Sequence, residues 1–270
     1  MTEGFERRFG GLRRLYGVAG AQRIFDAHVV VVGIGGVGSW AVEALARSGV
    51  RRLTLIDTDH VSESNINRQI HALEPSLGQS KAQAMRERIA LFHPDCQVHV
   101  IDDFVTPDNW PALLADDPAA PAALIDACDQ VRAKTALAAW ARCKGVPFVT
   151  VGAAGGKRLA QAVEVSDLAD VTHDPLLAQL RYRLRKEHGA ARSGRMGCTC
   201  VFSREAVAPP DASCSVDAGD GSLNCHGYGS VVSVTATFGL CAAGWVMNAL
   251  AGSASSFEAT SKHGKNDAII

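Results

Sequence analysis

A run of valines followed by closely spaced glycines, VVVVGIGGVGSW at residues 29–40, restricts most strongly how this chain can fold. The valines predict a buried strand, and the glycines predict a tight turn into a helix that begins near Ser39. Backbone N–H groups at the start of such a helix face the phosphates of a bound nucleotide. The glycines of the turn are Gly33, Gly35, Gly36 and Gly38. Their spacing is compatible with NAD, FAD or ATP, and the extra Gly36 hints at a ligand other than the two dinucleotides.

Segments of alternating strand and helix character follow this turn. They predict a doubly wound, mostly parallel α/β sheet of the Rossmann type with a C-terminal elaboration. The expected strands are 51–59, 97–105, 122–129 and 147–152, with helices near 79–92, 107–115 and 131–144. Beyond residue 156 we expect a strand at 160–168, a basic helix at 174–188, a loop, and an apolar helix at 230–252.

The length of 270 residues and the net charge of −1 suit one large domain and give no global attraction to nucleic acid. We expect one domain over 1–252, with a nucleotide-binding part at 1–155 and a substrate and dimer part at 156–252. The tail at 253–270 is polar and is expected to be flexible. The start of the chain has no apolar segment typical of a secretory signal, which predicts a cytoplasmic protein.

Residues 230–252 carry no charge over a length that could cross a bilayer. They are rich in Ser, Thr, Gly and Ala, which suit close helix packing, and they lack flanking aromatic or basic clusters. We therefore expect a buried or dimer-interface helix and no membrane association, with a membrane span as the open alternative.

The segment DTDHVSESNINRQIHALEPSLGQSK indicates which nucleotide the turn holds. Its acid at the end of the second strand suits a ribose, and this fits NAD and ATP equally. Cleavage of ATP also requires cations that neutralise the phosphates, whereas hydride transfer does not. The candidate side chains of this segment are Asp57, Asp59, Asn65, Arg68, Gln69 and Lys81. Their presence favours ATP.

Two further carboxylates close the strand in LIDACDQVRAK, at Asp126 and Asp129. Carboxylates at this position lie in the crevice at the switch point of the sheet, where they could hold Mg²⁺ beside the phosphates. The residues leave open which of the two binds the metal.

The joint set GIGGVG, DTD, NINRQ, GQSK and DACD resembles the ubiquitin-activating-like adenylating enzymes, the ThiF/MoeB/HesA family, over residues 7–155. Further stretches between residues 8 and 239 resemble its branch of tRNA threonylcarbamoyladenosine dehydratases. These stretches are RFGGLRRLYG, NRQIHAL, DDFVTPDN, DPLLAQLRYRLR, CVFSREA and VTATFG.

This resemblance implies a reaction in two steps. ATP adenylates the threonine carboxylate of the modified adenosine next to the anticodon of tRNA, and a urea nitrogen or oxygen then closes a ring while AMP leaves. The implied roles are ribose binding by Asp57, phosphate binding by Arg68 and Lys81, Mg²⁺ binding by Asp129, and support by Asn65, Gln69 and Asp126.

The resemblance also implies a homodimer in which an N-terminal arginine reaches the ATP of the partner subunit. Arg14 is the candidate among Arg7, Arg8, Arg13 and Arg14. A monovalent cation at the site and a cysteine desulfurase or sulfur acceptor as partner stay open.

Two other functions are alternatives. A MoeB/ThiF-like enzyme would adenylate the C-terminus of a small carrier protein, and it would be expected to have paired Cys-x-x-Cys motifs. A non-catalytic NAD-binding sensor would keep Asp57 but would not need Lys81 or Asp129.

The cysteines Cys198, Cys200, Cys214 and Cys225 are irregularly spaced, which predicts no zinc site. Cys225 is interpreted as a spectator thiol. The densest basic cluster consists of Arg181, Arg183, Arg185, Lys186, Arg192 and Arg195. For a tRNA substrate, this cluster is expected to contact phosphates; its alternative is a solvated helix face.

Overall fold

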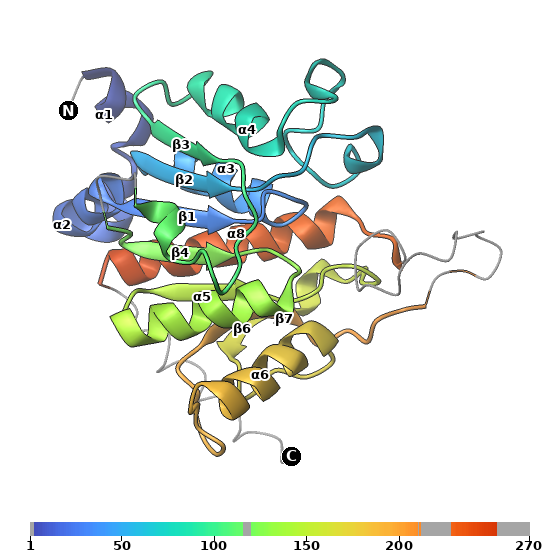
Figure 1. The fold of residues 1–270 in the computed structure, drawn as a ribbon. Coiled ribbons are helices and arrows are strands. Elements are labelled where there is room, and N and C mark those ends of the chain that lie inside the picture. Colours follow the sequence, from blue (N-terminus) through green and yellow to red (C-terminus); the bar gives the residue numbers. More distant parts are fainter. Residues whose placement is uncertain (1–2, 116–119, 210, 212–227, 253–270) are drawn as a thin grey trace, which may run out of the picture.

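The computed structural model describes residues 3–115, 120–209, 211 and 228–252. Its centre is a seven-stranded sheet in the order β3-β2-β1-β4-β5-β7-β6 (Figure 1). Every neighbouring pair is parallel except β6 and β7, which are antiparallel. The strands are β1 (His28–Val32), β2 (Arg52–Ile56), β3 (Gln97–Ile101), β4 (Ala123–Asp126), β5 (Phe148–Val151), β6 (Val163–Asp167) and β7 (Thr199–Ser203). The expected doubly wound, mostly parallel α/β fold is confirmed.

Helices cover both faces of this sheet, which explains the unbroken valine run of β1. Val29 and Val31 belong to the apolar core on the side of α3 (Gly38–Arg47) and α8 (Val232–Leu250). Val30 and Val32 belong to the core on the side of α5 (Val131–Lys144) and α6 (Pro175–Glu187) (Figure 1). Because successive side chains of a strand point to opposite faces, a strand buried on both sides is apolar at every position.

The remaining helices lie at the start of the chain and beside the edge strand β3. They are α1 (Glu3–Phe9), α2 (Leu12–Asp26), which has a kink at Gly17, and α4 (Lys81–Ala90). Short 3-10 helices are η1 (Glu63–Asn65), η2 (Glu74–Ser76), η3 (Ala112–Leu114) and η4 (Ala160–Ala162). The helices α1 and α2 are not among the elements expected from the sequence.

The bounds of three expected strands and one expected helix need correction. The strands expected at 51–59, 97–105 and 122–129 end earlier, at Ile56, Ile101 and Asp126. The polar residues that follow them form loops at the carboxyl end of the sheet, where the site lies. The helix expected near 107–115 is a set of turns with only η3, because Pro111, in the interior of the expected helix, lacks a backbone N–H.

Strand β7 was expected to be part of a loop. It inserts between β5 and β6, so it pairs with a strand that ends nearly fifty residues earlier in the chain. Local sequence patterns do not report such distant pairings.

Helix α8 packs closely on α3. A Cβ on Gly239 would lie 2.4 Å from the carbonyl oxygen of Val37 and 2.8 Å from the backbone nitrogen of Ala41. Within the described residues, α8 is the one helix whose length and apolar composition would allow it to cross a membrane. Its contacts with α3 and with the sheet favour the interpretation as a buried helix. The expected tail at 253–270 lies outside the described residues.

We predict that Gly239→Ala lowers the free energy of unfolding by about 1–3 kcal/mol, because the added methyl group forces α8 away from α3. The matched control is Gly244→Ala on the same helix, where a Cβ meets no atom within 4 Å. That change is expected to be neutral or to stabilise by up to about 1 kcal/mol. Urea unfolding measures both, and equal stabilities would contradict the packing of α8 described above.

Candidate active site

A cavity of about 400 Å³ opens at the carboxyl ends of the parallel strands. β1 pairs with both β2 and β4. The strands β2 and β3 are therefore added on one side of β1 and β4 on the other, and α/β proteins bind their ligands at this switch in strand order. The cavity is lined by the glycine turn and by the segments that follow β2, β3, β4 and β5. The structure therefore brings distant parts of the sequence to one place.

The glycine turn needs its glycines for two different reasons. Gly33 has φ of 85°, and a Cβ there would lie 2.7 Å from the carbonyl carbon and oxygen of Ala127. A Cβ on Gly38 would lie 1.7 Å from the carbonyl oxygen of Gly33, so Gly38 acts by close packing and does not line the cavity. Gly35 and Gly36 do line it, and their missing side chains leave room for a ligand against the backbone.

Asp57 follows β2 and faces the turn. Its Oδ2 accepts a hydrogen bond from the Ile34 N–H at 2.5 Å, and its Oδ1 accepts one from the Asp59 N–H at 2.8 Å. Burial raises the pKa of Asp57, against the lowering effect of these hydrogen bonds and of Lys81. Held in this way at the cavity wall, the carboxylate is placed to accept hydrogen bonds from ribose hydroxyls.

Two cations line the same cavity, and both are far more buried than isolated surface charges. Lys81 is the first residue of α4, is 7% exposed, and its Nζ lies 2.6 Å from Oδ2 of Asp59. Arg68 is 8% exposed, and its Nη1 donates to the carbonyl oxygen of Ser64 at 2.6 Å and to Oδ1 of Asn67 at 3.0 Å. Fixed, poorly hydrated cations of this kind suit a polyphosphate.

Asn65 and Gln69 have separate roles. Asn65 does not line the cavity; its Oδ1 accepts from the Ser62 N–H at 3.1 Å, and its carbonyl accepts from the N–H groups of Arg68 and Gln69. It therefore shapes the loop that presents them. Gln69 lines the cavity, and its Oε1 is buried with no hydrogen-bond partner among the described residues.

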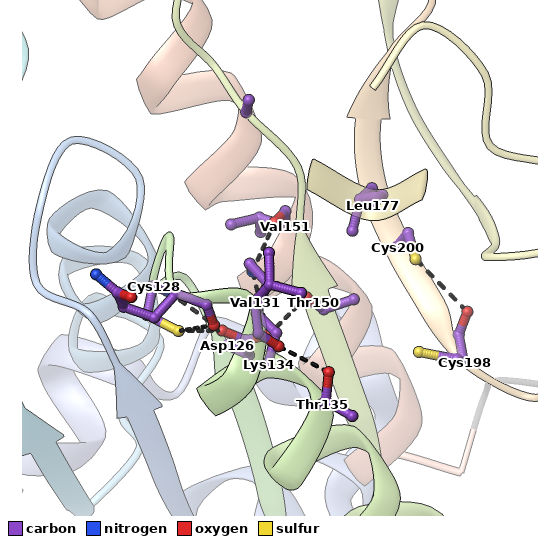
Figure 2. Close-up of polar contacts among 12 residues, drawn as sticks. Asp126, Cys128, Val131, Lys134, Thr135, Thr150, Val151, Leu177, Cys198 and Cys200 are labelled. Carbon is purple, nitrogen blue, oxygen red and sulfur yellow. Dashed lines mark hydrogen bonds and ion pairs between the residues drawn. The ribbon is translucent and has the colours of Figure 1, made fainter. Parts of the chain in front are cut away.

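Of the two candidate metal ligands, only Asp129 lines the cavity. Asp126 is fully buried beneath it, where its oxygens accept hydrogen bonds from Lys134, Thr150 and Cys128 (Figure 2). The oxygens of Asp126 are thus engaged by protein groups and do not face the cavity. This placement disagrees with the expectation that Asp126 binds metal. Asp129 is the remaining candidate.

The partner of Asp126 is Lys134, which is not among the site residues predicted from the sequence. Its side chain is 0% exposed, and burial alone would lower the pKa of Lys134, but the Asp126 carboxylate and Cys128 outweigh this and raise it. The group is therefore a buried ammonium. The sequence did contain a signal for this pair. Strand β4 ends in Asp126, and Lys134 is on the face of the next helix that packs against the sheet.

Arg14 lies exposed on α2 and does not line the cavity of its own chain.

Two arginines of the expected basic cluster form hydrogen bonds within the protein. Nη1 of Arg181 donates to the carbonyl oxygens of Leu168 and Val171, and Nε of Arg185 donates to that of Ala191. Arg181 is thus a structural residue, and the expectation of a phosphate contact applies to the other members.

Cys198 and Cys200 are buried in and next to β7, and Cys214 and Cys225 lie outside the described residues. Burial raises the pKa of Cys200. Over the described part of the chain, no group of three or more His, Cys, Asp or Glu side chains is arranged to hold a metal ion. The expectation on zinc stays a prediction, because half of the cysteines concerned are not placed.

The fold and the cavity together define a nucleotide-binding protein of the Rossmann-like α/β class, with cations placed for a polyphosphate. The model of the ThiF family matches residues 8–266, and the chain belongs to the ThiF family.

The tRNA threonylcarbamoyladenosine dehydratase of Escherichia coli is 46% identical over 251 residues, which cover 90% of this chain and 92% of that protein. Structures of E. coli tRNA N6-threonylcarbamoyladenosine dehydratase, TcdA, have been solved with AMP and with ATP. The AMP complex is 44% identical with a TM-score of 0.83, covering 94% of this chain and 98% of that one. The ATP complex is 42% identical with a TM-score of 0.82, covering 97% and 99%.

His71, in the loop between Arg68 and α4, gives a prediction on acid stability. Its side chain is buried with both ring nitrogens unpartnered among the described residues, and burial lowers the pKa of His71 to about 3, helped by Lys81 and Arg88. A histidine that must stay neutral in the folded state contributes stability above its ordinary pKa of 6.5, which is lost as the pH falls from 6.5 toward 3.

We expect the free energy of unfolding of the wild type to fall in this window by up to about 1.4 kcal/mol per pH unit from this group. His71→Gln should show a smaller fall, and the control His188→Gln, at an exposed histidine, should keep the wild-type slope. Urea unfolding at several pH values gives the slopes. A wild-type slope in His71→Gln would contradict the buried neutral histidine.

Proposed function

We propose that this protein is an ATP-dependent tRNA threonylcarbamoyladenosine dehydratase. The observation that carries the proposal is the single cavity that joins the glycine turn, Asp57, Arg68, Lys81 and Asp129. The similarity to dehydratases over nearly the whole chain supports the same assignment. The reaction forms a bond between a carboxylate oxygen of the substrate and the α-phosphorus of ATP, with pyrophosphate leaving. Ring closure on the carbonyl carbon then releases AMP.

The residues divide the work of holding ATP. The ribose lies at Asp57, and the phosphates follow along the N–H groups at the start of α3. Arg68 and Lys81 neutralise the charge that moves onto the leaving pyrophosphate, an electrostatic stabilisation that grows in the transition state. When ATP binds, the ammonium of Lys81 leaves the carboxylate of Asp59 and contacts the phosphates instead.

Mg²⁺ fits this site through Asp129. Its carboxylate is exposed at the cavity wall, and a cavity that holds a polyphosphate supplies the other oxygen ligands that Mg²⁺ prefers. When bound, the metal supplies further neutralisation of the phosphates and helps to orient them. Asp129 is assigned to hold it, and Asp126 is not. We assign no described residue to a monovalent cation.

The second step needs no acyl-enzyme intermediate. The described cysteine that lines the cavity is Cys128, and burial together with Asp126 raises the pKa of its thiol well above the ordinary value. A protonated thiol is a poor nucleophile. A urea nitrogen or oxygen on the same nucleoside as the activated carboxylate closes the ring in an effectively unimolecular step.

The tRNA is proposed to contact the exposed face of α6. This helix begins beside the cavity, since Leu176 lines it and the Asp174 cap accepts a hydrogen bond from the Ala153 N–H. Tyr182 is 62% exposed, with the ammonium of Lys186 5.6 Å from its ring centre. A cation and an aromatic ring on one face suit phosphate and base contacts.

A homodimer completes the proposal, with Arg14 supplied to the ATP of the partner subunit. Its exposure on α2, away from its own cavity, supports a role of this kind.

The decisive experiment incubates the purified protein with Mg-ATP and tRNA that carries threonylcarbamoyladenosine. Mass spectrometry of the nucleosides should find the base lighter by one water, together with AMP and pyrophosphate. An unchanged base, with pyrophosphate released only when a small protein ending in a free glycine carboxylate is added, would instead identify a carrier-protein activator.

We predict that Arg68→Met and Lys81→Met lower kcat/KM for ATP by tenfold to a hundredfold or more, because each loses a charge-assisted phosphate contact of about 1.5–3 kcal/mol. Both side chains are buried, so circular dichroism must first show a folded protein. Lys144→Met, at the exposed end of α5, is the control and should keep wild-type turnover. Normal turnover in Arg68→Met or Lys81→Met removes that residue from the site.

Charge reversal on α6 tests the proposed tRNA contact. Arg183→Glu with Lys186→Glu should weaken tRNA binding and flatten its dependence on salt, while the affinity for ATP stays unchanged. The control Arg7→Glu with Arg86→Glu changes the net charge equally on α1 and α4, which lie away from α6 (Figure 1). An equal loss of tRNA affinity in both double variants would show that net charge, and not α6, determines binding.

A further inference from the structure

Beneath the cavity, one buried ammonium joins three elements. Nζ of Lys134, on the first turn of α5, donates to Oδ2 of Asp126 at 3.1 Å, to Oγ1 of Thr150 at 3.0 Å and to the carbonyl oxygen of Val151 at 2.8 Å (Figure 2). The Thr150 hydroxyl in turn donates to Oδ2 of Asp126 at 2.6 Å. Every N–H of the ammonium therefore has an acceptor, and the three side chains form a closed triangle.

We propose that Lys134, through this triangle, is a positioning residue for adenylation. It holds the two loops of the cavity wall in the orientation that the reaction needs. The inference rests on the proposed function, because it concerns the same ATP site. The first loop, 127–130, carries Asp129 and follows β4. The second loop, 152–155, follows β5.

Each loop is tied to the triangle by a direct hydrogen bond. The N–H and the thiol of Cys128 both donate to Oδ1 of Asp126, at 3.2 and 3.1 Å. The carbonyl of Val151, the last residue before the second loop, accepts from Lys134. On its far side that loop is held by Asp174, whose Oδ2 accepts from the Ala153 N–H at 2.9 Å. Asp126 and Thr150 are register partners in the paired strands β4 and β5, so the backbone ladder fixes the strand spacing. Lys134 adds the side-chain contacts that link the two strand ends from which the loops start.

Stability alone gives a weak reason for such an arrangement. Lys134, Asp126 and Thr150 are all 0% exposed, and a buried ion pair in a sheet core can be replaced by apolar side chains without loss of stability. Apolar side chains cannot replace the orienting effect of this ammonium, because its three hydrogen bonds fix the positions of three partners at once. The loops so fixed carry the proposed metal ligand and face the place where the carboxylate must meet the α-phosphate.

Two substitutions at Thr150 separate positioning from packing. Thr150→Val keeps the volume and removes the hydroxyl, whereas Thr150→Ser keeps the hydroxyl and removes a methyl group. We expect Thr150→Val to lower kcat about tenfold to a hundredfold and to weaken the enhancement of ATP binding by Mg²⁺. ATP affinity without Mg²⁺, measured by calorimetry, should change less than about threefold, because Asp57, Arg68 and Lys81 are untouched.

Thr150→Ser should keep kcat within about twofold of wild type even though its melting temperature falls, because the hydrogen bonds of the triangle persist. The opposite pattern, with kcat following the melting temperature in both variants, would show a merely structural role and overturn the proposal. So would wild-type kcat and Mg²⁺ dependence in Thr150→Val.

A second variant covers the case that Thr150→Val does not fold. Lys134→Met with Asp126→Asn removes both buried charges together and should show the same loss of kcat with retained Mg²⁺-free ATP affinity, while wild-type kcat in it would overturn the proposal. Wild-type protein that consumes no ATP with the modified tRNA would refute the proposed function itself. Normal wild-type turnover beside unaffected variants refutes only the role of Lys134.

Discussion

The contact between the glycine turn and the segment after β4 is the constraint on which the site depends. Gly33 lies so close to Ala127 that a Cβ would overlap its carbonyl group, and a Cβ on Gly38 would lie even closer to the carbonyl oxygen of Gly33. Any side chain at these positions would force β1, α3 and the β4 loop apart. Because the N–H groups of α3 and the carboxylate of Asp129 are carried by those segments, this backbone contact determines whether they reach one ligand.

Charge is distributed around this contact in two ways. On the side of β2, Lys81 and Arg68 are held at the surface of the cavity, with partners that a polyphosphate can replace. On the side of β4, the ammonium of Lys134 is completely enclosed and satisfied by protein groups. The first arrangement suits ligand binding, and the second suits rigidity. A step that moves negative charge from one phosphate to another benefits from both, because the cations are in place before the charge moves.

The parts of the site that were predictable from the sequence are those within one local motif. The glycine turn, Asp57 and Lys81 lie in segments with a fixed spacing from β1 and β2, and the structure brings them to one cavity. The loop of Arg68 was recognisable as cationic, but its burial was not. Asp126 and Asp129 are three residues apart in one short segment, and only the three-dimensional structure shows that Asp129 faces the cavity and Asp126 faces Lys134. Strand β7 and the structural role of Arg181 depend on partners distant in the chain, so no local pattern reports them.

We propose that this cavity activates a carboxylate by transferring the adenylyl group of ATP to one of the carboxylate oxygens, with release of pyrophosphate. Substrate tRNA whose threonine carboxylate is labelled with heavy oxygen tests this directly, because the bridging oxygen stays on phosphorus when the ring closes. We predict that the released AMP carries one labelled oxygen for each base converted. Unlabelled AMP formed together with the ring-closed base would contradict adenylation of the carboxylate.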